Sequence, residues 1–507
     1  RGRPHLHRTG LARGGLGARD RAEGLRKEER AEHAHRGHAT IATTGVGTHT
    51  RRLGALFRAR SRGVGVLLAL CTLAAPWWNV PRDGADSAGM LAHLHAFFVD
   101  ADLLYDDEYA ALGMSPLFAF VTDEGVVSNH WPAGATWLQA PGWALGWLAA
   151  RGLAALGVGR GDPLGVVAVL GLRAWAMLAL AAIAWGVARL VARAQDDAGT
   201  PGARRAGWGV AAAFVLGTPL YHYAAESPLR PHLWGAGLVL ALVAVWGLPA
   251  LGSPRSRTLA LALLAGMATY VRPQLGPLVL LVAHDAWLGA RSGPARVRGL
   301  LLGGLVFGAF VLAHLRVQRW MYGEQLGDYA GSVTHHLGAF LASTHHGVLP
   351  WCPVLAVALV AMLRAAVLRE RGAWILLGLV AWQLWLDSGM RAIEPRAVLG
   401  TRTWSGGLAF GPRKLVDVLP LALPAVSSLV AAARRRGLGG VLAAVAALAC
   451  VPTLLLHASA WLDPDATTGG IMGAVEYRAA LARPLSAAAW ERAWAQRSVP
   501  LAVPVIV

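Results

Sequence analysis

Five carboxylates fall within nine residues of the chain, and they form its densest group of acidic side chains: Asp100, Asp102, Asp106, Asp107 and Glu108. Clustered carboxylates raise one another's pKa, which suits a general base that works near neutral pH. Several oxygen ligands in a short segment also suit a hard divalent cation. An acidic, solvated loop is the simpler interpretation, so the run by itself leaves catalysis, metal binding and solvation open.

A second segment, 389–414, concentrates positive charge and contains one acid, Glu394. Its five basic residues are Arg391, Arg396, Arg402, Arg413 and Lys414. Arginine offers a bidentate fork to phosphate and lysine a point charge. Glycines in the segment let the backbone approach a ligand closely. The segment therefore predicts a site for an anionic ligand that carries phosphate.

Arg272 interrupts a long apolar stretch directly before Pro273. An ionisable side chain at membrane depth costs about 2.5–3.5 kcal/mol on insertion scales, so it is expected to face a cavity or a partner. Snorkelling of Arg272 to the lipid headgroups is an equal alternative. Six further residues are candidates for lining a cavity: His130, Trp131, Glu226, His232, His345 and His346.

Each of these cavity candidates also has a purely structural interpretation. Trp131 suits an interfacial anchor, and the turn at Glu226 suits helix capping. The pairs His335-His336 and His345-His346 have the residue type for zinc, but adjacent histidines on one element diverge, so the sequence leaves any metal unknown.

The elements that position these residues are apolar runs of about 17–25 residues, the length that crosses a bilayer core of about 30 Å. Of the 507 residues, 55% are hydrophobic and 15% are charged, against about 25% charged in soluble domains. The sequence predicts an all-α, polytopic transmembrane bundle of about 11–12 spans with long outer loops. The expected spans are 64–80, 164–188, 207–224, 232–250, 259–271, 273–289, 299–316, 348–366, 373–388, 415–433 and 438–456, with an interrupted twelfth stretch at 133–156.

Orientation follows from arginine, which is enriched in cytoplasmic loops. If the short arginine-bearing loops are cytoplasmic, the N-terminus lies inside and the C-terminus outside. This topology requires that 133–156 does not cross, and that 259–271 and 273–289 meet at an outer turn. The outer loops are then 81–163, 225–231, the turn at 272, 317–347, 389–414 and the chain from 457 onward.

Three parts of the chain are expected. Residues 1–62 form a basic tail that cannot bury a core and is expected to be disordered. Residues 63–456 form the transmembrane domain. Residues 457–507 form an outer-side tail, partly an amphipathic helix.

The formal net charge of +18 does not favour nucleic acid as a partner, because much of the arginine lies in the N-terminal tail and in the short loops between apolar runs. The three cysteines lie in or beside apolar runs, as small buried residues do.

Taken together, these motifs resemble the bacterial GT-C superfamily, in the group related to protein O-mannosyltransferases and lipopolysaccharide sugar transferases. The resemblance covers about residues 64–456. Its most specific parts are Asp100-Ala-Asp102 with Asp107-Glu108-Tyr109, and Gly406-Gly-Leu-Ala-Phe410-Gly-Pro-Arg413-Lys414. The segment near Glu226 and His232 matches loosely, and His345-His346 stands where a Ser-Arg-His type of run is expected.

The resemblance implies a hexosyl- or pentosyltransferase of the cell envelope, in the bacterial inner membrane. It would transfer sugar from a polyprenyl-phosphate donor to a glycan, lipid or protein acceptor on the outer face. One of Asp100, Asp102, Asp107 or Glu108 would be the catalytic base or help to hold a divalent metal, the one cofactor implied. Arg272, Arg413, Lys414 and Arg402 would hold the lipid phosphate. Its partners are then lipids and saccharides, with no nucleic acid.

Two other classes of protein fit some of the same residues. A transporter or flippase of lipid-linked saccharide also needs outer arginines and broken helices, but such proteins often have repeated halves, and no internal repeat is evident here. An inactive scaffold of the same fold would turn the acidic loop away from Arg413. The distance between the acidic loop and Arg413 therefore separates these hypotheses.

Overall fold

The computed structural model describes residues 84–113, 120–122, 125–129, 131–199, 202–247, 253–289, 292–322, 336–389, 410–463 and 474–497. All of them belong to one compact unit, which spans Leu68–Val507. Helices make up most of this described part, and its only strands are the short antiparallel pair β1 (Phe120–Val121) and β2 (Val127–Ser128). The predicted tail 1–62 and the predicted span 64–80 lie outside the described residues.

Four helices are long and apolar enough to cross a membrane: Val166–Asp197, Gly293–Met321, Arg413–Arg435 and Gly439–Leu462. Only 6% of the apolar window of Gly293–Met321 is buried, against 72% for Arg413–Arg435. A helix that is apolar on all sides but packed on few of them needs lipid around it. Its outward leucines include Leu301, Leu305 and Leu312. The chain is therefore a membrane protein in which residues 413–435 lie inside the helix bundle.

Helix α5 (Val166–Asp197) joins the N-terminal and C-terminal parts of the unit. It packs against α4 (Gly134–Ala155), α6 (Ala203–Leu216), α7 (Leu220–Ala225), α8 (His232–Gly247) and α16 (Leu423–Arg435). Its buried face follows a helical spacing, with Leu172, Ala176, Leu180 and Val187 almost fully enclosed. Because α5 packs against so many elements, it fixes their positions relative to one another.

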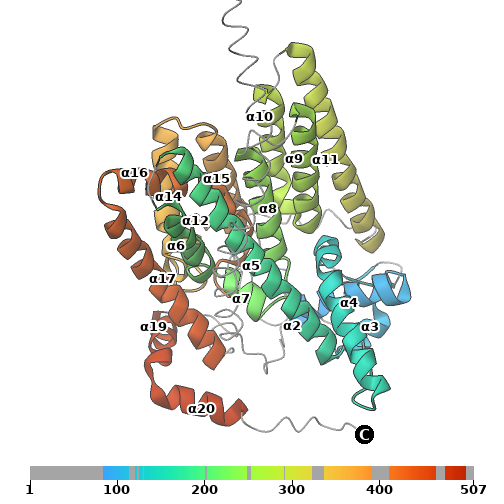
Figure 1. The fold of residues 1–507 in the computed structure, drawn as a ribbon. Coiled ribbons are helices and arrows are strands. Elements are labelled where there is room, and N and C mark those ends of the chain that lie inside the picture. The colour runs from blue at the N-terminus through green and yellow to red at the C-terminus, as the bar shows by residue number, and fades with distance from the viewer. Residues whose placement is uncertain are drawn as a thin grey trace, which may run out of the picture. The chain divides into compact units, whose positions relative to one another are not determined.

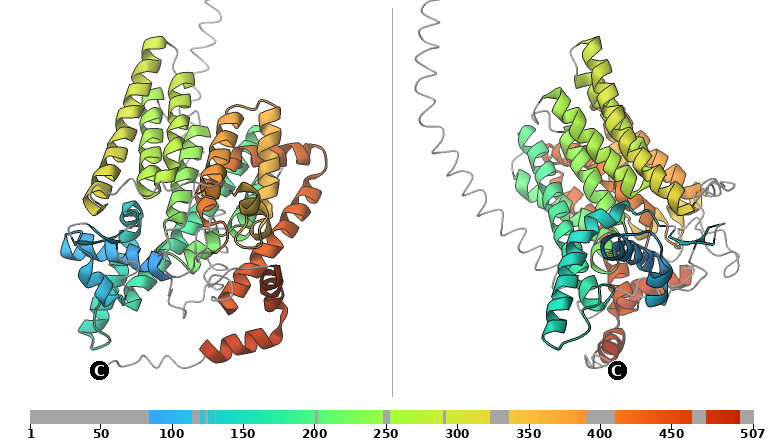
Figure 2. Two further views of the ribbon diagram at one scale, coloured as in Figure 1. Left: turned by 180° about the vertical axis from the view of Figure 1, so that it is seen from behind. Right: turned by 90° about the vertical axis from the view of Figure 1, so that its right-hand side faces the viewer.

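A group of helices follows α8, and Figures 1 and 2 show them side by side: α9 (Pro254–Val271), α10 (Val279–Gly289) and α11 (Gly293–Tyr322). Helix α9 ends at Val271, Arg272 adopts an extended backbone, and the 3-10 helix η3 (Pro273–Leu278) begins directly after it. The predicted break at Arg272–Pro273 is confirmed. Proline disfavours the helical conformation of the residue before it, which accounts for the break.

The C-terminal half brings a second group of elements together. The order is α12 (Leu337–Ala342), α13 (Val348–Trp351), α14 (Val354–Val367), α15 (Ala373–Gly389), η5 (Arg413–Ala422), α16, α17 (Gly439–Leu462), α19 (Ala474–Ala482), η6 (Arg483–Leu485) and α20 (Ala487–Arg497). The 3-10 segment η5 packs against α8 and α15, and it continues directly into α16. Helix α17 continues to Leu462, past the predicted end of that span at 456, and Ser459, Ala460 and Leu462 in this extension are buried.

The first predicted outer loop, 81–163, is largely helical. It contains α2 (Gly84–His95), a five-residue π-helical segment η1 (Ala96–Asp100), the short helix α3 (Asp106–Ala111) and α4. Helix α4 runs unbroken through Pro141, where the sequence predicted an interruption. Figures 1 and 2 show α2, α3 and α4 together at one end of the bundle, opposite the end where α10 meets α11.

The eleven predicted spans correspond to helices unevenly. Stretch 207–224 divides into α6 and α7, stretch 348–366 divides into α13 and α14, and stretch 232–250 forms the shorter helix α8. Prolines stand at both divisions, Pro219 and Pro353, where each blocks a helical hydrogen bond. Apolar run length therefore located helices, but in the described part of the chain four of them, not eleven or twelve, are long and apolar enough to cross a membrane.

Candidate functional site

Asp86 on α2 connects the first loop to two arginines from later parts of the chain. Asp86, in the first turn of α2, forms an ion pair with Arg413 at the start of η5. Arg230, in the turn before α8, places Nη1 3.5 Å from the same oxygen of Asp86. Trp131 donates from Nε1 to the other oxygen at 2.9 Å. Two guanidinium groups from distant segments therefore converge on one carboxylate.

The first loop is folded so that Asp86 faces these arginines. Asn129 donates to the carbonyl of Gly89 at 2.6 Å and accepts from the Trp131 amide at 3.1 Å. His93 donates to the Trp131 carbonyl at 2.8 Å. A β-carbon at Gly89 would overlap the Trp131 ring, so only glycine allows this approach. These contacts hold the Trp131 indole against α2, where it donates to Asp86.

Charge controls the ionisation of Asp86. Burial by itself raises the pKa of this carboxyl, but attraction to Arg413 and Arg230 and the hydrogen bond from Trp131 outweigh it and hold the pKa well below its usual range. Asp86 is therefore ionised while both arginines are paired with it. A carboxylate in this state is a weak base, and it becomes a stronger one when the arginines bind another anion.

After Arg413, η5 contains two further ionisable residues, Lys414 and Asp417, and both are buried. The carboxylate of Asp417 lies 3.3 Å from Arg272 Nε and 3.5 Å from His232 Nδ1. A β-carbon at Gly235, one turn into α8, would overlap the Asp417 carboxylate. Arg272 at the helix break is therefore held by Asp417, a partner within the protein.

The Phe-Gly-Pro-Arg-Lys segment, 410–414, is positioned by aromatic packing. The Phe410 ring stacks on His222 and on His457 at centroid distances of 4.4 and 4.6 Å, and it meets Trp351 edge-on at 5.1 Å. Tyr223 donates to the Phe410 carbonyl at 2.9 Å. Gly411 follows with φ +62°, a conformation that favours glycine. This rigid turn carries Arg413 to Asp86.

The predicted acidic residues do not meet Arg413. They form a separate cluster at the other end of α2, the arrangement expected of an inactive scaffold if one of them were the base. His95 Nδ1 lies 2.6 Å from Asp100 Oδ2 and 3.1 Å from Glu108 Oε1. Asp107 joins them, and it is exposed, as is Asp100. Asp102 and Asp106 are also exposed but lie outside the cluster. Burial and the neighbouring carboxylates of Asp107 and Asp100 raise the pKa of Glu108 to about 9. Nine residues of helix separate Asp86 from His95, or about 13 Å along the axis.

The remaining predicted residues are dispersed. Glu226 lies 3.8 Å from the buried Arg173 of α5. His346 is buried, its ring stacks on His345 at 4.4 Å, and it contacts Trp351. Arg402 and His130, with His335, lie outside the described residues. Within the described part of the chain, the cluster around Glu108 is the one group of three or more histidine, cysteine or acidic residues close enough to hold a metal ion.

No protein-family model, curated protein or solved structure matches this chain.

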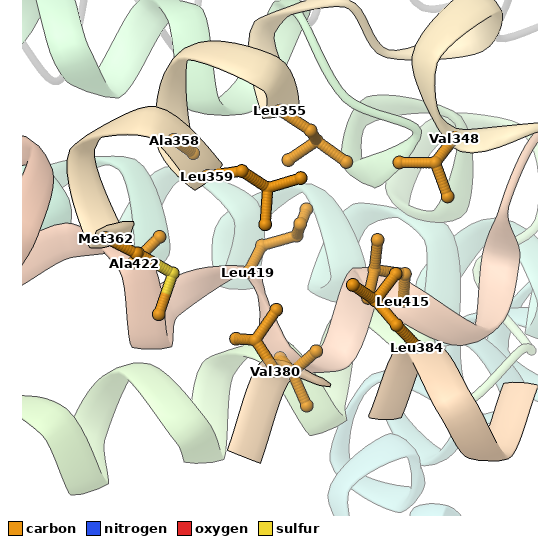
Figure 3. A pocket seen from close by; sticks show the side chains of 11 residues that line it. Val348, Leu355, Ala358, Leu359, Met362, Val380, Leu384, Leu415, Leu419 and Ala422 are labelled. Carbon is orange, nitrogen blue, oxygen red and sulfur yellow. The ribbon is translucent and has the colours of Figure 1, made fainter. Parts of the chain in front are cut away.

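An apolar groove lies beside η5, and Figure 3 shows its lining side chains turned toward a common space. Its enclosed volume is small, about 20 Å³, and the rest of the groove is open to the outside. It lies between α14, α15 and the segment η5–α16, and its lining residues are Val348, Leu355, Ala358, Leu359, Met362, Val380, Leu384, Leu415, Val418, Leu419 and Ala422. Leu415 follows Lys414 directly, so the groove adjoins the charged segment of η5.

Sequence reasoning missed Asp86, and also Asp417 and Asp387 as charged residues inside the protein. Asp86 has only Asp83 close to it in the sequence and lies fourteen residues before Asp100, so it does not belong to the dense run of acids. Its position in the first outer loop was the available signal. Asp387 is fully buried near the end of α15, where Gln383 donates to it at 2.7 Å. An isolated acid inside an apolar run was the corresponding signal there.

Proposed function

We propose that this chain is a glycosyltransferase of the bacterial inner membrane that uses a polyprenyl-phosphate sugar as donor. It transfers the sugar to a glycan, lipid or protein acceptor on the outer face. The observation that carries the proposal is the convergence of Arg413 and Arg230 on Asp86, beside an apolar groove. Such a site offers an anion-binding pair, a carboxylate and a place for a lipid chain together.

The arginine pair is suited to the phosphate of the donor. Both guanidinium groups approach one oxygen of Asp86, so the position between them accepts an oxyanion. A phosphate has more oxygens than the carboxylate and can take bidentate bonds from arginine. It therefore competes with Asp86 for Arg413 and Arg230. In the donor complex the arginines stabilise the leaving phosphate, which is a charge-stabilising role.

Asp86 is the carboxylate that we assign as the base. Once the phosphate binds the arginines, the cause of the low Asp86 pKa is removed and its basicity rises. The acceptor hydroxyl attacks the anomeric carbon, the bond from that carbon to the phosphate oxygen breaks, and Asp86 takes the hydroxyl proton. Asp100, Asp102, Asp107 and Glu108 lie toward the far end of α2 and serve the fold of the first loop in this scheme.

Arg272 and Lys414 act on the site indirectly, through ion pairs with buried acids. Arg272 is already paired with Asp417, and Lys414 is buried close enough to Asp387 for the two charges to attract. These pairs balance the buried charge and keep η5 in position. Arg413, the first residue of η5, is thereby held beside Asp86. Their attraction for the phosphate is long-range, and it adds to that of Arg413 and Arg230.

The open side of the apolar groove beside η5 is proposed to contact the first isoprene units of the donor. A tryptophan in place of Ala358, which lines the groove, is expected to weaken binding of a long-chain polyprenyl phosphate about tenfold, since each buried methylene is worth about 0.8 kcal/mol. Affinity for a soluble sugar phosphate without an isoprene chain should stay the same. The measurement is equilibrium binding in detergent. Ala356→Trp, on the exposed side of the same helix, is the matched control. Equal losses for both ligands would contradict the assignment.

The proposal also requires the polytopic topology, with a cytoplasmic N-terminus and an outer C-terminus. A reporter enzyme that works only outside the inner membrane is expected to be active when fused after Asp463, where α17 has ended. The same reporter fused after Arg436, between α16 and α17, is expected to be inactive there. The reverse pattern would place Asp86 and Arg413 on the cytoplasmic side and refute transfer on the outer face.

A further inference from the structure

Arg257, near the start of α9, joins three helices at the end of the bundle where α10 meets α11 (Figure 1). Its Nη2 atom lies 2.6 Å from Asp285 Oδ1 of α10, and it donates to the carbonyl of Trp246 at the end of α8, also at 2.6 Å. Fifteen residues of α9 separate Arg257 from Arg272, or about 22 Å along the axis. This contact is therefore far from Arg272 and from the η5 segment that Arg272 contacts.

The loop between α14 and α15 brings a second arginine to the same place. Gly372 has φ +70°, and it lies so close to the Trp246 indole that a β-carbon there would overlap the ring. Arg371, directly before it, is exposed and lies close enough to Asp285 and His284 for its charge to act on both. No ion pair between described residues involves Arg371. Two guanidinium groups therefore lie near one carboxylate, which leaves one formal positive charge.

The Arg257 guanidinium has hydrogen-bonding capacity that the protein does not use. Its side chain is only 10% exposed, and Nη2 makes both of the bonds described above. Its Nε atom is buried and has no hydrogen-bond partner among the described residues. A buried donor without an acceptor is costly. An oxyanion beside Asp285 would accept from Nε, and arginine binds phosphate oxygens especially well.

The side chains around the two arginines are those of a membrane surface. Trp287 on α10 and Trp374 on α15 are 52% and 64% exposed, and Leu288 is exposed beside Trp287. Arg296 lies over the Trp287 ring at 5.2 Å from its centroid. Exposed tryptophans beside arginines are typical of the headgroup level of a bilayer. The exposed apolar side chains favour a ligand with acyl chains over a soluble phosphate compound.

We propose that Arg257 and Arg371 bind the phosphate of an anionic phospholipid, in the leaflet at this end of the bundle. One phosphodiester charge matches the one formal positive charge that Asp285 leaves. Basic pockets between membrane helices bind anionic headgroups in this way. The lipid would join the α8–α10 group to the loop between α14 and α15 and hold the two together. This inference is independent of the proposed function, because lipid binding needs neither donor, acceptor nor turnover.

The test measures binding of a fluorescent phosphatidylglycerol to the full-length protein in a zwitterionic detergent. Two unlabelled competitors are phosphatidylcholine, which has no net charge, and glycerol 3-phosphate, which has no acyl chains. Wild type is expected to bind the fluorescent lipid saturably, and each competitor should displace it at least about tenfold less well than unlabelled phosphatidylglycerol. Arg371→Gln is expected to weaken binding about tenfold, the effect of losing one charge-assisted contact.

Arg369→Gln is the matched control. Arg369 is exposed in the same loop, two residues before Arg371, so its replacement removes the same charge outside the proposed site and should change affinity by less than about twofold. Arg257→Gln should also weaken binding, but it leaves the buried Asp285 unpaired, so the exposed Arg371 is the decisive position. Protection of 368–374 from hydrogen exchange should increase with phosphatidylglycerol in wild type and in Arg369→Gln, but not in Arg371→Gln.

Three results would overturn the proposal. The first is equal affinity of wild type and Arg371→Gln for phosphatidylglycerol. The second is an equal loss in Arg369→Gln and Arg371→Gln, because it would report only a general attraction of the lipid to a positive surface. The third is competition by glycerol 3-phosphate as strong as that by phosphatidylglycerol, because the ligand would then be a soluble phosphate compound and not a lipid.

Discussion

Replacing Asp86 with asparagine is expected to lower the rate of sugar transfer by about 10²–10⁴-fold, the usual effect of losing a general base. Asparagine keeps the shape of the side chain and an oxygen that still accepts from Trp131. It removes the charge that attracts Arg413 and Arg230, and it cannot take a proton from the acceptor hydroxyl. The measurement is turnover of a polyprenyl-phosphate sugar by purified protein in lipid nanodiscs.

Asp106→Asn is the matched control for this variant. Asp106 is a carboxylate of the same loop, it is exposed, and no ion pair with another described residue involves it. Its replacement should leave turnover within about twofold of wild type, since exposed charges contribute little. If Asp86→Asn keeps wild-type turnover, or if both variants fall equally, Asp86 is not the base.

Replacing Arg413 with alanine is expected to weaken binding of the donor by about 10- to 100-fold. One charge-assisted hydrogen bond is worth about 1.5–3 kcal/mol, and 1.4 kcal/mol corresponds to a factor of ten. Arg413→Lys should recover part of this loss, because lysine keeps the charge but loses the bidentate fork. Binding of a polyprenyl phosphate and of the intact donor, each measured by titration, checks both variants.

Arg483→Gln controls for the loss of any arginine that is paired with an aspartate. Arg483 lies 3.6 Å from Asp463 and donates to Ser459 at 2.9 Å, near the end of α17. It takes no part in the proposed phosphate site, so donor affinity should match that of wild type. Equal donor affinities for Arg413→Ala and wild type would leave Arg413 as a structural partner of Asp86 and nothing more.

The sequence predicted the helical architecture well because lipid imposes a simple pattern on it. Apolar runs located most of the helices, and Arg272–Pro273 marked the break between α9 and η3. Helix ends were less predictable, as at Leu462. Whether a run forms one helix or two depended on single prolines such as Pro219 and Pro353, whose effect is local and is not visible in mean hydropathy.

The candidate site was predictable only in part, because its contacts join residues that are far apart in the chain. The basic segment that ends at Arg413 was conspicuous, since five positive charges on the expected outer side oppose the usual topology. Asp86, the partner of Arg413, was not conspicuous. Asp86 and Arg230 come together only because α2, η5 and the turn before α8 meet in the fold, and no local sequence pattern predicts that contact.

The acidic run from Asp100 to Glu108, unlike Asp86, was visible in the sequence. The density of carboxylates between Asp100 and Glu108 predicted a cluster, and the fold collects three of the five acids around His95. Ala101 adopts a left-handed conformation with φ 58°, which turns the chain after η1. Asp102 and Asp106 are left in solvent. Composition predicted the cluster, but the backbone path decided which acids belong to it.

The affinity of the Asp86→Asn protein for a polyprenyl phosphate tests the central claim most directly. In our account the Asp86 carboxylate and the lipid phosphate compete for Arg413 and Arg230. Removing the carboxylate charge should therefore tighten phosphate binding, by about tenfold if the competition is worth about 1.4 kcal/mol, while transfer is lost. Weaker or unchanged binding of the lipid by Asp86→Asn would contradict the account, because it would mean that the two arginines do not hold the phosphate.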